Sequence, residues 1–172
     1  MNHFKYLRLP DLITFIGLFA VIASTFFAWK GYFLIAYLLI IGQIVADFFD
    51  GKVARKMKRE NDLGIHLDNF SDFYTIVNDV LLGIFIGISH FSMYLVFPLF
   101  IAAGALRLST FTILKNTDPK TYHGIPTTAA SFIIASFLIL NWKFFNLQMD
   151  YWLILYLLLA FLMVSPLKIK KW

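Results

Sequence analysis

Six strongly apolar segments follow one another along this chain, and each has about the length needed to cross a lipid bilayer as a helix. A spanning helix needs about 20 mostly apolar residues. Of the 172 residues, 60% are hydrophobic, well above the roughly 45–50% apolar content of soluble domains. We therefore expect an all-α, polytopic membrane protein, with one domain over residues 1–172. The predicted transmembrane helices are residues 11–29, 31–50, 66–88, 92–114, 124–142 and 150–166.

The first ten residues, MNHFKYLRLP, differ from the six apolar segments because aromatic and basic side chains alternate. Such a pattern is typical of a short helix in the plane of the membrane interface. No small-residue cleavage site stands out after the first apolar segment, so we expect a membrane element rather than a cleaved signal peptide. The sequence contains no Cys, which excludes disulfides, thiolate metal ligands and cysteine nucleophiles.

The basic residues of the predicted loops are distributed unevenly between the two sides of the membrane. Twelve lie on the side of the two termini, and only Lys30 and Lys143 lie on the other side. Because cytoplasmic loops carry an excess of Lys and Arg, we expect both termini to be cytoplasmic. The net charge of +5 does not indicate nucleic-acid binding, since these residues flank apolar spans, where they contact anionic lipid headgroups.

Four acidic residues interrupt the apolar pattern around the second and third predicted helices. Asp47 and Asp50 are three residues apart near the end of one helix, and Asp68 and Asp72 are four apart at the start of the next. Each spacing places the pair on one helix face. The charged connector between them allows the helices to lie side by side, so we expect the four carboxylates to converge at the cytoplasmic boundary. Charged groups at membrane depth are costly and usually functional.

A cluster made only of carboxylates suits hard cations such as Mg²⁺, Mn²⁺ or Ca²⁺ rather than Zn²⁺. Four acids could hold two ions, and ion pairs about 3.5–4 Å apart are common in phosphoryl chemistry. Two other interpretations remain open, namely a divalent-cation transporter with acids along its path and a non-catalytic helical scaffold. Transporters often show broken helices and inverted repeats, and we find neither pattern in the sequence.

The acids belong to a longer pattern over residues 47–72, D-x-x-D-G-x-x-A-R, eight residues, then G-x-x-x-D-x-x-x-D. This pattern resembles the signature of the CDP-alcohol phosphatidyltransferases, and it is far more specific than a lone glycine motif. Every fixed position of the signature is present, at Asp47, Asp50, Gly51, Ala54, Arg55, Gly64, Asp68 and Asp72.

The resemblance implies a membrane enzyme with six transmembrane helices, usually a homodimer, whose active site lies at the cytoplasmic boundary. Its members transfer a phosphatidyl group from a CDP-linked lipid to an alcohol and release CMP. By position, the resemblance implies two divalent cations, Mg²⁺ or Mn²⁺, held mainly by three of the acids. These main metal ligands would be Asp47, Asp50 and Asp68. Asp72 would contribute to the metal site and act as the base that deprotonates the acceptor hydroxyl.

The remaining signature positions would line the CDP pocket. Gly51, Ala54 and Gly64 are small, so the backbone can approach a bulky nucleotide closely. Arg55 offers a planar guanidinium that suits the oxygens of a diphosphate. We therefore expect these four residues to bind the donor substrate.

Three further segments resemble phosphatidylserine synthases within that family. They are residues 104–111 (GALRLSTF), 122–130 (YHGIPTTAA) and 161–165 (FLMVS), and they make L-serine the expected acceptor. Arg107 lies inside an apolar helix and needs an anionic partner. That partner could be a lipid phosphate or a substrate carboxylate, which would make Arg107 a binding residue, or it could be Asp79 in a structural ion pair.

The chain also departs from the serine enzymes. His66, Asn69 and Thr110 replace their usual residues, and Asp79 is an additional acid on the same helix face as the signature acids. Asp79 could hold an acceptor amine. Phe73 stands where several glycerol- and inositol-phosphate enzymes carry a basic residue, which makes a phosphorylated acceptor less expected. Inositol phosphate, glycerol 3-phosphate or another amino alcohol stay as alternative acceptors, and the donor could be a diacyl or an ether lipid.

Overall fold

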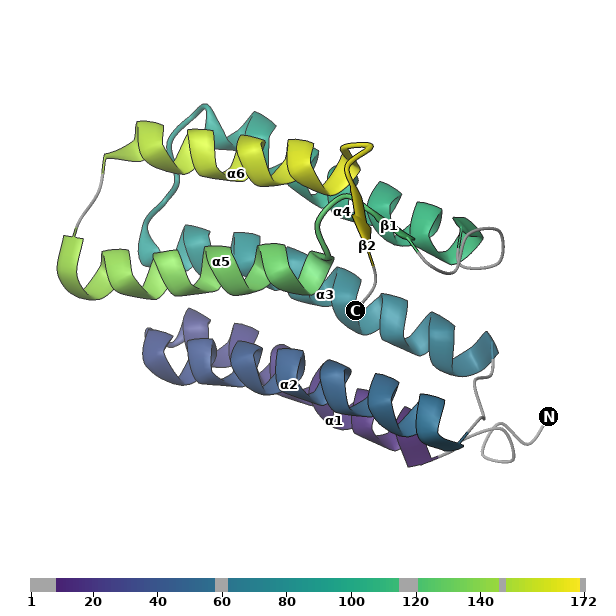
Figure 1. Cartoon of the computed structure of the whole chain (residues 1–172). Helices are drawn as coiled ribbons and strands as arrows, with labels where there is room; N and C mark the ends of the chain where they lie inside the picture. The colour runs from purple at the N-terminus through teal and green to yellow at the C-terminus, as the bar shows by residue number, and fades with distance from the viewer. Residues whose placement is uncertain (1–8, 58–61, 115–120, 146–147, 171–172) are drawn as a thin grey trace.

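The computed structural model describes residues 9–57, 62–114, 121–145 and 148–170, and α-helices form its architecture, as predicted. Consecutive helices run in opposite directions along the bundle (Figure 1). A short π-helical segment, Asn141–Phe145, continues the fifth helix. The six helices are α1 (Leu9–Trp29), α2 (Phe33–Met57), α3 (Asp62–Ile86), α4 (Met93–Leu114), α5 (Thr127–Leu140) and α6 (Met149–Val164).

The helices are arranged as three stacked pairs, with α1 beside α2, α3 beside α5, and α4 beside α6 (Figure 1). Helix α3 contacts α1, α2, α4 and α5, so it lies at the centre of the bundle. One face of α3 is accordingly buried even though it is polar, and it carries Ser71, Thr75, Asn78 and Asp79. The central position of α3 places its acidic residues inside the protein rather than against lipid.

An aromatic cluster anchors α6 to α4 at the core. The Tyr156 ring packs edge-to-face against Phe97 and Phe100, with ring centroids 5.2 and 5.1 Å apart. Edge-to-face pairs of this kind stabilise a core beyond the area that they bury. The outward faces of the helices expose large apolar side chains instead, such as Phe19 and Phe161, as expected for helices that contact lipid.

Four helical segments in the described part of the chain are long and apolar enough to cross a membrane: Pro10–Trp29, Phe33–Val53, Met93–Ile113 and Thr127–Phe145. Helix α6 is shorter but also apolar over Asp150–Val164. Helix α3 has the length of a span, but polar residues on its buried face lower its hydropathy. The membrane character predicted from the sequence is therefore supported, and the predicted interfacial helix falls largely on residues 1–8, outside the described residues.

Two helix boundaries around the acidic pattern differ from the prediction. Helix α2 continues to Met57 instead of ending near residue 50, and α3 begins at Asp62 instead of residue 66. The residues after Gly51 are mostly good helix formers, and no Pro or second Gly ends the helix before Met57. Most of the predicted connector is therefore helical, so Gly51 and Gly64 lie within helices.

A short antiparallel ribbon, which the sequence did not predict, ties the end of the chain to the segment before α5. Its strands are β1 (Thr121–His123) and β2 (Lys168–Lys170), with Tyr122 opposite Ile169. Gly124 follows β1 with φ at +71°, and a Cβ there would collide with the carbonyl oxygen of Met163 at the end of α6. This glycine therefore lets the backbone cross α6 closely before α5 begins.

Candidate active site

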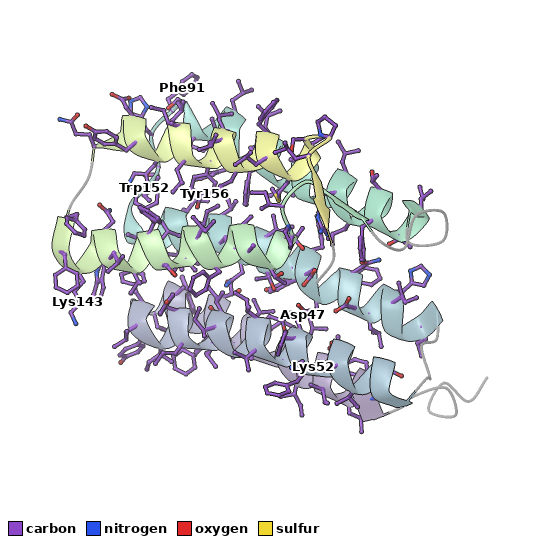
Figure 2. All side chains as sticks on the ribbon, in the orientation of Figure 1. Asp47, Lys52, Phe91, Lys143, Trp152 and Tyr156 are labelled. Carbon is purple, nitrogen blue, oxygen red and sulfur yellow. The ribbon has the colours of Figure 1, made fainter. Side chains whose placement is uncertain are left out.

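The acidic residues of the signature gather inside the half of the bundle in which α2 ends and α3 begins. Figure 2 shows Asp47 and Lys52 toward this end, whereas Phe91 and Lys143 lie toward the opposite end. Asp47, Asp50 and Asp68 each offer one carboxylate oxygen, and these oxygens lie within 4.8 Å of one another. We call these three residues the acid trio. The helical spacings had predicted the convergence of four carboxylates, and these are three of the four.

The chemistry of the acid trio fits a hard divalent cation. The Asp47 and Asp68 carboxyl groups lie within hydrogen-bonding range of each other, where two ionised groups repel strongly unless a proton or a cation lies between them. Oδ1 of Asp68 is buried and has no hydrogen-bond partner among the described residues. An all-carboxylate set with a spare oxygen matches the ligand preference of Mg²⁺ or Mn²⁺.

Asp72 lies beside the acid trio but has a different environment. It is 9% exposed, and the Thr127 hydroxyl donates a hydrogen bond of 2.9 Å to its Oδ2. Its Oδ1 is buried and has no hydrogen-bond partner in the described part of the chain. One oxygen of Asp72 is therefore held by α5, while the other is open to a further interaction.

Asp50 is held by a second threonine. Thr14 of α1 donates a hydrogen bond of 2.5 Å to Asp50 Oδ2, and both residues are buried. The sequence reasoning missed Thr14 and Thr127 as site residues. Thr14 lies on a different helix with no motif around it, whereas Thr127 lies in the 122–130 segment that resembles the serine enzymes.

A network of buried and half-buried polar side chains links α1 to α3. Asn78 donates to the Ser24 hydroxyl at 3.1 Å and accepts from the Thr25 hydroxyl at 2.6 Å. A Cβ on Gly17 would collide with Oε1 of the buried Gln43, which lies one turn before Asp47. The hydrogen bonds align α1 with α3, and the lack of a side chain at Gly17 lets α1 pack closely against Gln43 of α2. The geometry of the acids depends on this packing of α1, α2 and α3.

Arg107 is buried beside the acids rather than exposed to lipid. It is 8% exposed, and its Nε donates to the Ile125 carbonyl oxygen at 3.1 Å. Its guanidinium carbon lies 5.2 Å from the centroid of the Phe111 ring. Its positive charge acts on the carboxyl groups of Asp47 and Asp72.

Asp79 lies on α3, two turns beyond Asp72, and is fully buried. Both of its carboxylate oxygens lack a hydrogen-bond partner among the described residues, so no hydrogen bond joins it to Arg107. The Ser131 hydroxyl lies close to the Asp79 carboxyl, and Tyr156 donates to the Asp79 backbone oxygen at 3.1 Å. The structural ion pair between Arg107 and Asp79 is therefore the weaker of the two interpretations left open by the sequence.

The small signature residues lie on the same two helices as the acids. Gly51 in α2 and Gly64 in α3 are both half-buried. Ala54 and Arg55 are also in α2, at a spacing that places them one turn beyond Asp50 and Gly51, but their side chains lie outside the described residues.

At three positions this chain carries residues that differ from those usual in the serine enzymes, and these three residues do not lie among the acids. His66 and Thr110 are exposed, and Asn69 donates a hydrogen bond of 2.8 Å to the Thr112 hydroxyl on α4. Asn69 therefore joins α3 to α4. These departures from the serine enzymes lie on the outer surface or in a helix contact.

The site and the fold agree with the family comparison, in which residues 7–164 match the CDP-alcohol phosphatidyltransferase family. The chain belongs to this family. A CDP-diacylglycerol–serine O-phosphatidyltransferase from Helicobacter pylori is 30% identical over 166 residues, which cover 92% of this chain and 70% of that protein. One of the same name from Methanocaldococcus jannaschii is 29% identical, over 97% of this chain and 73% of the other.

An archaetidylserine synthase from Methanothermobacter thermautotrophicus is also similar, at 29% identity over 77% of this chain and 58% of that protein. The chain matches only part of the length of each of these relatives. Family membership makes the protein a phosphatidyltransferase of phospholipid synthesis, and its apolar helices make it an integral membrane protein. The sequence-based prediction of the family is thus confirmed.

Proposed function

We propose that this protein transfers a phosphatidyl group from a CDP-linked lipid to L-serine and releases CMP, which yields phosphatidylserine or its ether analogue. The observation that carries this proposal is the acid trio with Asp72 held separately beside it. The similarity to serine transferases over most of the chain supports serine as the acceptor.

The acid trio is the proposed metal site, for two divalent cations, Mg²⁺ or Mn²⁺, with Asp72 close enough to contribute. Bound cations would neutralise the diphosphate of the donor and stabilise CMP as it leaves. Gly51, Ala54, Arg55 and Gly64 are the proposed CDP-binding residues. Gly51 follows Asp50 directly in α2, and Gly64 precedes Asp68 by one turn in α3, so a nucleotide at these positions would have its diphosphate next to the acid trio.

Asp72 is the proposed general base. Its Oδ1 accepts the proton of the acceptor hydroxyl while the acceptor oxygen forms a bond to the phosphorus of the donor. The phosphorus–oxygen bond to CMP breaks in the same displacement. The hydrogen bond from Thr127 keeps Oδ2 occupied, so the chain presents the other oxygen of Asp72 to the acceptor.

Arg107 is the proposed anion-binding residue for the serine carboxylate or the lipid phosphate. It is buried beside Asp47 and Asp72, so an anion there lies within reach of the reacting hydroxyl. Asp79 lies seven residues beyond Asp72, about 10 Å along the helix axis. A serine whose hydroxyl contacts Asp72 would not extend that far, so the geometry favours Arg107 over Asp79 as the residue that recognises the acceptor.

We further propose that all six helices cross the membrane as one domain, that both termini and the acids face the cytoplasm, and that the protein is a homodimer. The orientation is supported by the basic residues of the predicted loops. The end of the bundle that holds the acids is also the end that these loops flank.

An acceptor panel tests the proposal. Purified protein in lipid nanodiscs is given CDP-diacylglycerol or its ether analogue, together with serine, ethanolamine, inositol phosphate or glycerol 3-phosphate, and CMP release is measured. We expect serine to be preferred over ethanolamine, because ethanolamine lacks a carboxylate and would leave the buried Arg107 charge unpaired. We expect it to be preferred over the phosphorylated acceptors because Phe73 stands where several of their enzymes carry a basic residue. A preference for either phosphorylated acceptor would reject serine but keep the transferase, whereas no CMP release with any acceptor would reject both.

A further inference from the structure

Thr127 is the first residue of α5 and makes the contact that distinguishes Asp72 from the acid trio. Its side chain is 2% exposed, and its hydroxyl donates to Asp72 Oδ2 at 2.9 Å. The residue before it, Pro126, has φ of −57° and ψ of 143°, and α5 packs against α2 and α3. The Thr127 hydroxyl therefore lies at the start of a helix that packs against both helices that carry the acids.

The hydrogen bond constrains Asp72 in a way that a general base requires. A carboxylate can rotate and use either oxygen, and beside the acid trio it could turn toward a cation. A hydrogen bond to an ionised acceptor is stronger than one between neutral groups, and threonine is a stiff donor because its β-branched side chain has few rotamers. With Oδ2 held in this way, Oδ1 is the oxygen that has no hydrogen-bond partner among the described residues.

We propose that Thr127 is a positioning residue that orients Asp72, so that Oδ1 accepts the proton of the acceptor while Oδ2 stays bound to α5. This inference rests on the proposed function, since it assigns a task to the base of that reaction. No hydrogen bond joins Thr127 to the acid trio in the described part of the chain, so we expect its loss to affect the proton-transfer step more than metal binding. Loss of a hydrogen bond to an ionised group typically costs about 10- to 100-fold.

Three variants test this role: Thr127→Val keeps the shape but removes the hydroxyl, Thr127→Ser keeps the hydroxyl, and Thr128→Val is the matched control. Thr128 is the half-buried neighbour on the same helical turn. CMP release is measured as kcat and KM for CDP-diacylglycerol and for the acceptor, together with the Mn²⁺ concentration that gives half-maximal rate and the melting temperature in detergent.

For Thr127→Val we expect kcat to fall about 10- to 100-fold, with the KM for the lipid, the Mn²⁺ requirement and the melting temperature close to those of the wild type. Thr127→Ser should recover most of the rate, and Thr128→Val should behave as the wild type. A wild-type rate for Thr127→Val overturns the inference. A loss shared by Thr127→Ser, or one that follows the melting temperature, also overturns it, because either result marks a packing role.

The inference and the proposed function can fail separately in this experiment. An active wild-type enzyme with an unaffected Thr127→Val variant rejects the positioning role alone. A wild-type enzyme that releases no CMP with any acceptor rejects the transferase, and with it the role assigned to Thr127. Turnover with an acceptor other than serine leaves the test of Thr127 fully valid, since every acceptor hydroxyl must lose its proton.

Discussion

Replacing Asp72 with Asn separates its proposed role as a base from a role as a metal ligand. Asparagine has nearly the same shape, and its side-chain oxygen can still accept the hydrogen bond from Thr127. The substitution therefore removes the negative charge and the basic oxygen without opening a cavity at this buried position. Loss of a general base typically lowers the rate about 10²–10⁴-fold, equivalent to roughly 3–5 kcal/mol of transition-state stabilisation.

The structure also predicts what Asp72→Asn should not change. Asp72 lies outside the acid trio, whose oxygens are within 4.8 Å of one another. The Mn²⁺ concentration for half-maximal CMP release and the affinity for CDP-lipid should therefore stay near their wild-type values. Asp68→Asn serves as the control, because Asp68 belongs to the trio and its loss should abolish the metal response.

The assay is CMP release by purified protein in nanodiscs over a series of Mn²⁺ concentrations, with CDP-lipid binding followed separately. If Asp72→Asn weakens Mn²⁺ activation or CDP-lipid binding as much as it lowers the rate, Asp72 is chiefly a metal ligand. A variant with near-normal turnover would refute the assignment of Asp72 as the base.

Three further predictions concern the neighbours of Asp72. Chelation of divalent cations should abolish CMP release and added Mg²⁺ or Mn²⁺ should restore it, whereas activity that survives chelation would contradict the metal site. Thr14→Val removes the hydrogen bond to Asp50, a member of the trio, so it should raise the Mn²⁺ requirement about 10- to 100-fold, and an unchanged Mn²⁺ titration would limit Thr14 to helix packing. Arg107→Ala should raise the KM for the acceptor or the lipid with little change in expression or melting temperature, and a variant that is merely less stable would instead indicate a structural role for Arg107.

The helices and the convergence of the acids could be predicted because both follow from local spacing. Apolar segments of spanning length define helices, and acids three and four residues apart share a helix face, so two such helices side by side bring Asp47, Asp50 and Asp68 together. The burial of Arg107 also followed from a single charged residue within an apolar helix.

The partners of the acids could not be predicted, because they depend on how distant helices pack. Thr14 and Thr127 contact Asp50 and Asp72 across 36 and 55 residues of sequence, and no local pattern encodes such contacts. The ribbon between β1 and β2 was missed for the same reason. Asn69 was noted only as a departure from the serine enzymes, and its hydrogen bond to Thr112 on α4 could not be predicted from the motif either.

The central claim is that the acid trio is the metal-dependent active site of a serine phosphatidyltransferase. The most direct measurement is the formation of labelled phosphatidyl- or archaetidylserine from labelled serine and the matching CDP-lipid, with purified wild-type protein and the Asp68→Asn variant side by side. The account predicts product for the wild type with Mg²⁺ or Mn²⁺, no product after chelation, and none for Asp68→Asn even though the variant folds and inserts. Product formed by Asp68→Asn, or by the wild type without a divalent cation, would contradict the account.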